Sequence, residues 1–340
     1  MDLVSIIIPN YNREDLVVET VQNMLDQDYP AKEVIVVDDG STDGSIERLK
    51  AFGDNITLLT QKNQGPGAAR NYGMEAASGT YVQFMDNDDL ASRNKISSQV
   101  IRLQKENADV VYSPWAKFDI KAHSIAATSP VLQSEGIPRS SMIKAILEGW
   151  STVLQTALFK KELLHDIGPF KTDVSYLEDI DYLVRVILKS AEIAFESSPI
   201  IIYRNNSTEK LSAVGTDNIK KSKAEAVFFD AFISHLKTHV PAQYRQLESR
   251  FAFKAAEIFH NLEGVPEFLD SMEQLRELKA KLPSTWRLQA KKKLGQYRNG
   301  IRQRTHGHRY NKHFRPQPLS EHHCSLILDL GFKEIEANLS

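Results

Sequence analysis

The sequence has one cysteine, Cys324, among its 340 residues, so no disulfide can form within the chain. A lone cysteine favours a reducing compartment. No apolar run approaches the ~18 to 20 residues that a helix needs to span a bilayer. Asp2 places an acid near the N-terminus, and the apolar run from Leu3 ends at Pro9, which is not the pattern of a signal peptide. These absences predict a cytoplasmic protein.

The chain also has little net charge, −2 from 42 Lys and Arg against 44 Asp and Glu. Hydrophobic residues at 41% and charged residues at 25% are ordinary for a globular protein, which excludes wholesale disorder. The charge is unevenly placed, because residues 286–315 hold ten Lys or Arg and no acid. Such a segment indicates a local anionic partner, and general binding of nucleic acid is not expected.

Short apolar runs alternate with helical patterns up to about residue 200, which is typical of an α/β sheet. Strands are expected at 3–8, 33–37, 56–59, 81–85 and 109–112, and Asn12 is expected to cap the first helix. Short connections predict a Rossmann-like, doubly wound and mostly parallel sheet, in which ligands bind beyond the C-terminal ends of the strands. Residues 9–12, 38–43 and 86–89 all lie at such ends.

Beyond residue 205 the pattern changes to mostly helix. Apolar side chains share one helical face over 224–236 and another over 251–262, and these faces suit a homodimer contact as well as a core. The polar stretch 205–217 is the expected boundary. The sequence therefore predicts an α/β domain over 1–205 and a mainly helical C-terminal module over 206–340.

The segment Asp86-Asn87-Asp88-Asp89 places three carboxylates directly after a predicted buried strand. Such carboxylates repel one another unless a cation is present. Hard oxygen ligands suit Mg²⁺ or Mn²⁺, which can bridge a protein to a substrate diphosphate. The alternative is a solvated acidic turn that caps the following helix, and position alone does not decide between the two. Residues 38–43 are ordinary turn chemistry when taken alone.

Two further segments have both a structural and a functional interpretation. Gly67 to Arg70 opens a helix with small side chains, and an arginine there can hold phosphate oxygens or simply lie at the surface. The run is neither a P-loop nor G-x-G-x-x-G. Glu178, Asp179 and Asp181 stand at a predicted helix start, where the helix dipole favours acids. The functional alternative is a carboxylate base for a nucleophilic hydroxyl.

Taken together, the motifs resemble the family 2 glycosyltransferases of the GT-A fold in residue type, order and spacing. The resemblance covers roughly residues 3 to 204 and rests on five segments: 9–12, 36–43, 67–71, 84–89 and 178–179. It implies a GT-A catalytic domain over 1–205. The nucleotide-binding half would span about 1–113 and the acceptor half about 114–205.

The resemblance also implies roles for single residues. Asp39 would accept a hydrogen bond from the base, the feature by which such enzymes usually prefer uridine. Asp88 would be the direct ligand of Mn²⁺ or Mg²⁺, and Asp179 would be the base for the acceptor hydroxyl, supported by Glu178. The nucleotide site as a whole would comprise Pro9, Tyr11, Asn12, Glu14, Asp39, Arg70, Asp86 and Asn87.

The implied activity is inverting transfer of a sugar from a nucleotide diphosphate sugar, a UDP-sugar, to a hydroxyl of a glycan or lipid-linked acceptor in surface polysaccharide or glycoconjugate synthesis. The Q-x-x-R-W pattern of processive synthases is absent, which favours a non-processive enzyme. Two alternatives remain. A sugar-nucleotide pyrophosphorylase normally has a Gly-rich, basic loop after its first strand, unlike residues 9–12. A catalytically silent scaffold at the membrane has no need of Asp86, Asp88 and Asp179.

The basic segment 286–315 carries one apolar stripe at helical spacing: Trp286, Ala290, Leu294, Tyr297 and Ile301. An amphipathic helix with a tryptophan and many cations can lie on an anionic membrane, and we expect peripheral contact with the inner face of the cell membrane. The alternative is that the stripe packs on the catalytic domain. The residues 322–324, His-His-Cys, could suggest a metal site, but they lack a further ligand group, and we interpret their proximity as incidental.

Overall fold

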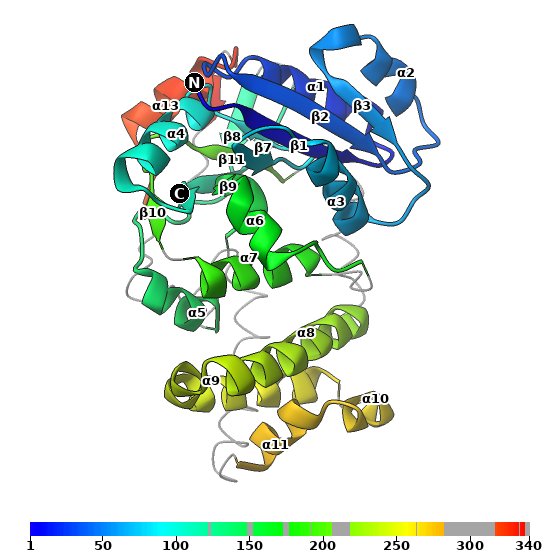
Figure 1. Cartoon of the computed structure of the whole chain (residues 1–340), viewed down its shortest axis with the longest axis vertical. Coiled ribbons are helices and arrows are strands. Elements are labelled where there is room, and N and C mark those ends of the chain that lie inside the picture. Colours follow the sequence, from blue (N-terminus) through cyan, green and yellow to red (C-terminus); the bar gives the residue numbers. More distant parts are fainter. Residues whose placement is uncertain are drawn as a thin grey trace.

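The computed structural model describes residues 1–121, 124–147, 152–172, 177–190, 192–205, 218–262, 264–281, 317–332 and 334–336. Two sheets with flanking helices form the upper part of the molecule in Figure 1, and a layer of helices lies below them. The basic segment 286–315 lies outside the described residues, and so does the predicted amphipathic helix.

The larger sheet has seven strands in the order β10-β6-β9-β4-β1-β2-β3. They are β1 (Val4–Asn10), β2 (Lys32–Asp38), β3 (Thr57–Thr60), β4 (Tyr81–Phe84), β6 (Val110–Tyr112), β9 (Leu158–Lys160) and β10 (Ile193–Phe195). The first four run parallel, whereas β9 lies antiparallel between β4 and β6. The five expected strands are confirmed as β1, β2, β3, β4 and β6, and so is the mostly parallel sheet.

Strand β1 is buried along its whole length because helices cover both faces of this sheet. Ile7 packs in one apolar cluster with Ala69 of α3 (Pro66–Ala76), and Ile6 packs in another with Val17 of α1 (Glu14–Leu25). A Cβ atom on Gly73 would lie 2.4 Å from Cγ2 of Ile7. Glycine at this position therefore lets α3 approach the sheet closely.

The other helices on the sheets are α2 (Ser45–Lys50), α4 (Lys95–Glu106), α5 (Arg139–Leu147), α6 (Lys161–Ile167) and α7 (Glu178–Lys189), with short 3₁₀ turns at Gly53–Asn55 and Leu154–Thr156. The smaller sheet has the order β12-β8-β7-β11-β5. Its strands are β5 (Leu90–Ala91), β7 (Trp115–Ile120), β8 (Ser124–Ala127), β11 (Ile201–Arg204) and β12 (Glu334–Glu336).

The described residues after 316 return to the smaller sheet. Strand β12 pairs in parallel with β8, and Ile327 of α13 (Glu321–Leu328) is buried in the apolar cluster of the smaller sheet. His322 and His323 each bring a ring nitrogen within 3.2 Å of a main-chain oxygen, of Ser198 and Ser197 respectively. This segment therefore differs from the expected single module over 206–340, because its apolar side chains complete the sheet.

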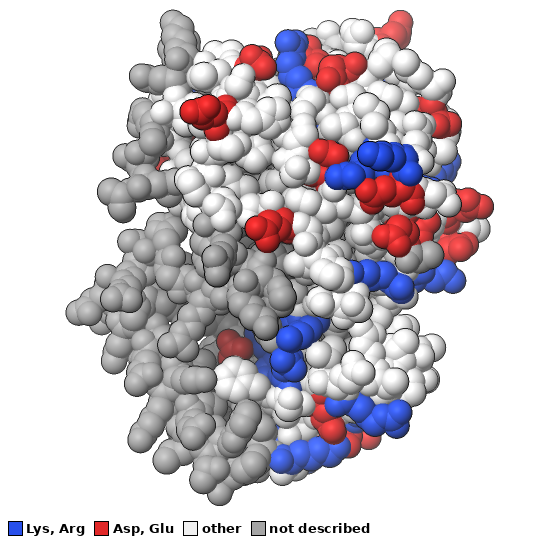
Figure 2. Space-filling model, turned by 90° about the vertical axis from the view of Figure 1, so that its left-hand side faces the viewer, with Lys and Arg blue, Asp and Glu red and all other residues white. Residues whose placement is uncertain are grey.

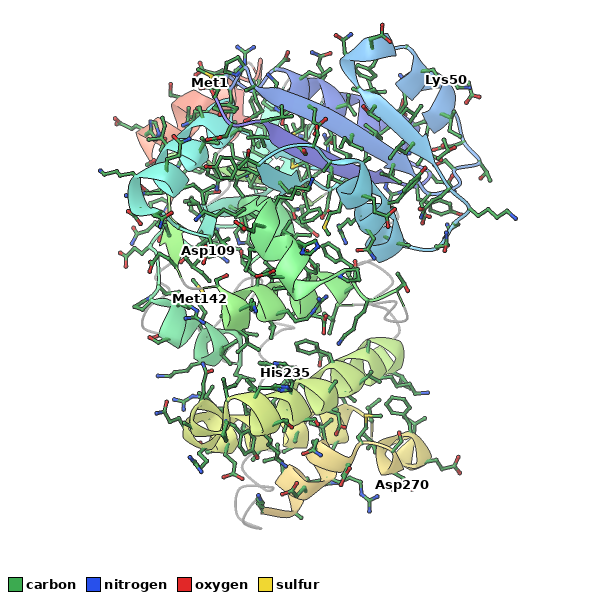
Figure 3. The ribbon with its side chains drawn as sticks, viewed as in Figure 1. Met1, Lys50, Asp109, Met142, His235 and Asp270 are labelled. Carbon is green, nitrogen blue, oxygen red and sulfur yellow. The ribbon has the colours of Figure 1, made fainter. Side chains whose placement is uncertain are left out.

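The helical layer consists of α8 (Asn218–His239), α9 (Pro241–Asn261), α10 (Pro266–Asp270) and α11 (Glu273–Lys281). The expected apolar faces of α8 and α9 bury Phe232 and Phe251 against each other, in a cluster that continues to Ile143 of α5. Figure 3 places His235 on the side of α8 that faces α7. The layer therefore packs against α5 through α9, and a homodimer contact remains a prediction.

On the face seen in Figure 2, Lys and Arg of the described residues are interspersed with Asp and Glu. Within the described ranges, none of the helices combines the length and apolar character that crossing a membrane requires.

A polar side chain in the core departs from the apolar pattern. Lys95, at the start of α4, is fully buried. Its ammonium nitrogen donates to the side-chain oxygen of Gln83 on β4 and, at 2.7 Å, to that of Gln99. Burial lowers the pKa of Lys95 well below its ordinary value, because the charged form loses its hydration.

This buried lysine predicts a pH dependence of folding stability. An unfolded chain keeps the lysine proton up to about pH 10.4, whereas the folded chain releases it at a lower pH. Between those values the unfolded state binds more protons, so the unfolding free energy of the protein should rise with pH relative to that of Lys95→Met. Urea unfolding across alkaline pH measures this difference, with Lys105→Met on the exposed side of α4 as the matched control. Parallel curves for the protein and Lys95→Met would contradict the prediction.

Candidate active site

The C-terminal ends of β1, β2 and β4 lie side by side, because Asn10 pairs with Asp38 and Ile7 with Phe84 in the parallel register. Asn10 joins the three turns that follow. Its side-chain amide nitrogen donates to Asp38 at 2.8 Å, and its amide oxygen accepts from Asn87 at 2.8 Å. The structure thus brings the predicted site segments 9–12, 38–43 and 86–89 together at one edge of the sheet.

Asn12 and Glu14 shape this edge by holding the turn after β2. The side-chain oxygen of Asn12 accepts from the amide of Thr42 at 2.8 Å, and the Glu14 carboxylate accepts from the amide of Gly44 at 2.8 Å. The predicted helix cap is wrong: α1 begins at Glu14, and Asn12 has a positive φ of 49° with its side chain turned to Thr42. A partner thirty residues away on the neighbouring turn replaces the local cap.

Asp38 and Asp39 have different hydrogen-bond partners in the turn after β2. Asp38 is fully buried and accepts from the side chains of Asn10 and Ser41. Asp39 accepts from the side chain of Gln61 at 2.7 Å and from the amides of Gln64 at 2.9 Å and Gly65 at 2.7 Å. A carboxylate offers about four acceptor positions, so room remains for one further donor. The role of Asp39 toward a base stays a prediction.

Pro9 and Tyr11 differ in their exposure. Pro9 is buried in β1, opposite Val37 of β2. The Tyr11 residue, in contrast, is 45% exposed. An exposed aromatic ring at the strand edge can stack on a planar base.

Arg70 lies at the centre of the charged cluster. Its guanidinium is buried and donates to Asp86 at 2.9 Å and to Glu178 at 3.0 Å. Burial opposes the charge, but Asp86, Glu178 and Asp179 together raise the pKa of Arg70 above its ordinary value. The buried Nε–H has no acceptor among the described residues, which leaves a donor for a ligand.

Gly67 explains how α3 brings Arg70 to this position. A Cβ atom on Gly67 would lie 3.0 Å from the carbonyl oxygen of Lys171 and 3.7 Å from Cγ of Glu178. Glycine therefore lets the start of α3 approach the main chain at Lys171, while Glu178 of α7 lies at an ordinary contact distance. The sequence did not predict this neighbour.

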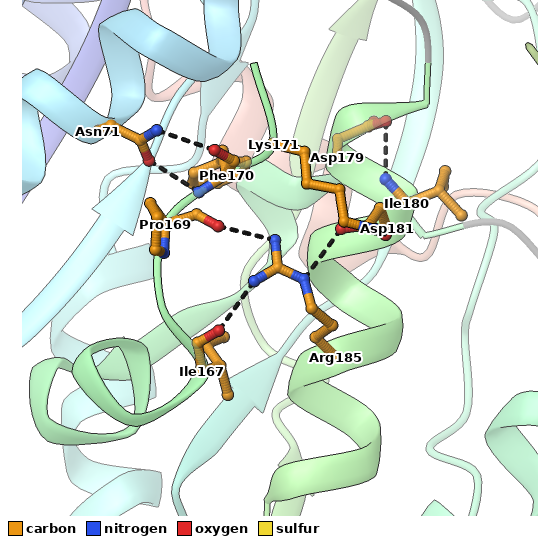
Figure 4. A network of polar contacts seen from close by, with 9 residues as sticks. All are labelled: Asn71, Ile167, Pro169, Phe170, Lys171, Asp179, Ile180, Asp181 and Arg185. Atoms are coloured by element: carbon orange, nitrogen blue, oxygen red, sulfur yellow. Dashed lines mark hydrogen bonds and ion pairs between the residues drawn. The ribbon is translucent and has the colours of Figure 1, made fainter. Parts of the chain in front are cut away.

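Asp179 occupies the first turn of α7, next to this cluster. Its carboxylate accepts from the amide of Ile180 at 2.8 Å (Figure 4). Although part of the residue remains exposed, burial of the carboxylate raises its pKa to about 6, with a further contribution from Glu178 and an opposing one from Arg70. A carboxylate with such a pKa is a stronger base than an ordinary aspartate and is still ionised at neutral pH.

A polar network fixes the helix that carries Asp179 (Figure 4). Arg185 donates to the Asp181 carboxylate and to the carbonyl oxygens of Ile167 and Pro169, each at 2.9 Å. Asn71 exchanges two hydrogen bonds with the main chain of Phe170, at 2.9 and 2.8 Å. Sequence reasoning missed this network, although the i, i+4 spacing of Asp181 and Arg185 was a signal for its first contact.

The three aspartates after β4 differ in their surroundings. Asp86 contacts Arg70, and Asp89 is fully buried, with one oxygen accepting from the amide of Arg204 at 2.8 Å and the other from Gln155. Asp88 is half-buried, and its carbonyl oxygen accepts from Nε of Arg204 at 2.9 Å. The repulsion expected of this acidic segment is therefore countered by the Arg70 guanidinium at Asp86 and by hydrogen bonds from Gln155 and the Arg204 amide at Asp89.

The donor set fits a metal that is shared with a substrate. In the part of the chain that is described, His, Cys, Asp and Glu form no group of three or more that could hold an ion. Mg²⁺ is ordinarily bound through one or two carboxylates together with substrate phosphates. Asp88 and Asp86 supply oxygens of that kind on a single turn.

The chain resembles known glycosyltransferases in sequence. A family described as "Glycosyl transferase family 2" matches residues 5–168. Glycosyltransferase GlyG of Streptococcus pneumoniae is 30% identical over 61% of this chain and 72% of its own length. An uncharacterized glycosyltransferase of Rickettsia typhi is 33% identical over 58% of this chain, and the match spans 63% of that relative's length.

Solved structures share the fold. Staphylococcus aureus TarS (residues 1–349), in complex with UDP-GlcNAc, superposes with a TM-score of 0.54 at 20% identity and covers 88% of this chain and 92% of its own. The mannosyltransferase PcManGT of Pyrobaculum calidifontis, in complex with GDP-Man and Mn²⁺, gives 0.55 at 19% identity, over 85% and 84%. From the sequence matches and this fold, the chain belongs to the family 2 glycosyltransferases and has the GT-A architecture.

Proposed function

We propose that the protein transfers a sugar from a UDP-sugar to a hydroxyl of a glycan or lipid-linked acceptor, with inversion at the anomeric carbon and with Mn²⁺ or Mg²⁺. The observation that carries this proposal is the Asp179 carboxylate, with its pKa raised to about 6, beside the cluster that Arg70 forms with Asp86 and Glu178. A single displacement with inversion needs a base and a diphosphate site that face one anomeric carbon from opposite sides.

The proposed reaction moves one proton and exchanges one bond. The acceptor oxygen forms a bond to the anomeric carbon, the bond to the diphosphate oxygen breaks, and Asp179 takes the hydroxyl proton. Arg70 offsets part of the negative charge of Asp86 and Glu178, which lowers the repulsion that an anionic diphosphate would meet, and its Nε–H has no acceptor among the described residues. A divalent ion on Asp88 supplies charge stabilisation for the leaving diphosphate when it is bound.

The nucleotide specificity of the proposal rests on the second turn. Asp39 keeps an acceptor position and Tyr11 offers an exposed ring, while Asn12, Glu14 and Asn87 hold the surrounding turns and Pro9 lies near the end of β1. The complexes of TarS with UDP-GlcNAc and of PcManGT with GDP-Man and Mn²⁺ support a nucleotide sugar and a divalent ion. We propose uridine as the base because the resemblance to family 2 glycosyltransferases implies that preference, and because Asp39 keeps an acceptor position for an N–H donor.

Calorimetric titration with UDP and GDP, each with and without Mn²⁺, tests the donor site. UDP should bind, and more tightly with Mn²⁺, and Asp88→Ala should remove the increment that Mn²⁺ provides. Asp54→Ala, in the short turn before β3, controls for the loss of an acid. Preferential binding of GDP would overturn the assignment of Asp39, and no binding of either nucleotide would favour a catalytically silent scaffold.

The proposed base predicts both a mutant effect and a pH profile. Asp179→Asn should bind UDP normally and lose about 10²- to 10⁴-fold in transfer rate, the usual contribution of a general base. Because only the ionised carboxylate accepts a proton, the rate should fall as pH drops through about 6. Single-turnover transfer from UDP-GlcNAc across this range measures both. A near-normal rate in the variant would show that another group is the base.

Contact of the segment 286–315 with the membrane is a proposal from sequence, since it lies outside the described residues. Substitutions test it better than truncation, because truncation would also remove β12 from the smaller sheet. Replacing Lys291, Lys292 and Lys293 by Gln should weaken binding to anionic vesicles by about 3 kcal/mol, or on the order of a hundredfold, at ~1 kcal/mol per basic residue. Sedimentation with anionic and neutral vesicles measures the change, and equal binding of variant and parent would contradict it.

A further inference from the structure

Arg204 is a buried cation that the proposed reaction does not use. It is the last residue of β11 and is 5% exposed. Its Nε donates to the carbonyl oxygen of Asp88 at 2.9 Å, and its backbone amide donates to the Asp89 carboxylate at 2.8 Å. One residue of the smaller sheet therefore contacts two successive residues of the turn that follows β4.

The guanidinium is held from its other side as well. Its terminal nitrogen donates to the carboxylate of Glu19 on α1 at 2.5 Å. A planar guanidinium with Nε and a terminal nitrogen both engaged has little freedom to rotate. Arg204 thus connects α1 with the main chain at Asp88.

The turn is anchored at its other positions too. Arg70 contacts the Asp86 carboxylate at 2.9 Å. Asp89 accepts from Gln155, whose carbonyl oxygen accepts at 2.9 Å from Gln83, the residue that also contacts buried Lys95. The Asp88 main chain lies between these anchors, and Arg204 is the side chain that fixes its carbonyl.

We propose that Arg204 is a positioning residue for metal-dependent donor binding: it holds the main chain of Asp88 in the conformation from which the carboxylate meets a divalent ion on the donor diphosphate. The inference rests on the proposed function and concerns the same site. Partners that orient a metal ligand typically contribute about 10- to 100-fold to metal affinity or activity. Lysine retains the charge but not the fork, so it cannot satisfy Asp88 and Glu19 in the same geometry.

The test is calorimetric titration of UDP at a series of Mn²⁺ concentrations. Arg204→Met should need at least about tenfold more Mn²⁺ for half of the gain in UDP affinity, and Arg204→Lys an intermediate amount. UDP affinity without metal should be unchanged, a separation that general destabilisation would not produce. Arg102→Met, which removes an arginine paired with Glu106 and Glu196, is the matched control.

Amide hydrogen exchange of residues 86–89 in the metal-free protein gives a second measurement, and it should be faster in Arg204→Met. If that variant does not fold, Arg204→Lys decides by the same titration. An unchanged Mn²⁺ requirement in both variants, with the increment lost in Asp88→Ala, overturns this inference alone. Absence of any Mn²⁺ effect in the parent protein overturns the metal-dependent function and this inference with it.

Discussion

Electrostatic repulsion among the carboxylates at one edge of the larger sheet limits how the candidate site can be built. Parallel strands end together, so the acids that follow them cannot avoid one another. The positive charge of Arg70 reduces this repulsion. Because the guanidinium is buried, the energy of its two ion pairs depends strongly on their geometry. Gly73 and Gly67 are then required, because α3 must lie close to β1 and to the main chain at Lys171 to deliver the guanidinium. The need to place Arg70 among these acids thus accounts for the close packing of α3 as well as for the ion pairs of the site.

The central strands could be predicted because their signal is local. Each short apolar run, such as the one that became Val4–Asn10, ends at a turn residue and needs no distant partner to be recognised. The candidate site segments could be predicted as far as their gathering at strand ends. Arg70 and the acids at 178–181 were candidates from residue type and position, and their assigned roles, which the resemblance implies, stay predictions although Arg70 contacts Glu178, the neighbour of Asp179.

What the sequence could not predict depends on distant partners. Asn12 favours a local cap by propensity, but Thr42 on the neighbouring turn takes its side chain. Arg204 ends a strand that is otherwise apolar and aromatic, and only the tertiary structure reveals its contact with the carbonyl oxygen of Asp88. Strand β9 lies antiparallel between β4 and β6. Its three residues carry no signal of which strands it pairs with or in which direction it runs.

The return of β12 to the smaller sheet has a consequence for the order in which the protein folds. Its pairing joins residues 124 and 334, which are more than two hundred positions apart. Contacts between such distant segments form slowly, because the intervening chain must be closed into a loop first. A ribosome must also release almost all of the described chain before the pair can exist. The larger sheet, built from residues before 196, can assemble earlier, so the edge of β8 stays uncovered during synthesis and is the place where a nascent chain is open to wrong pairing.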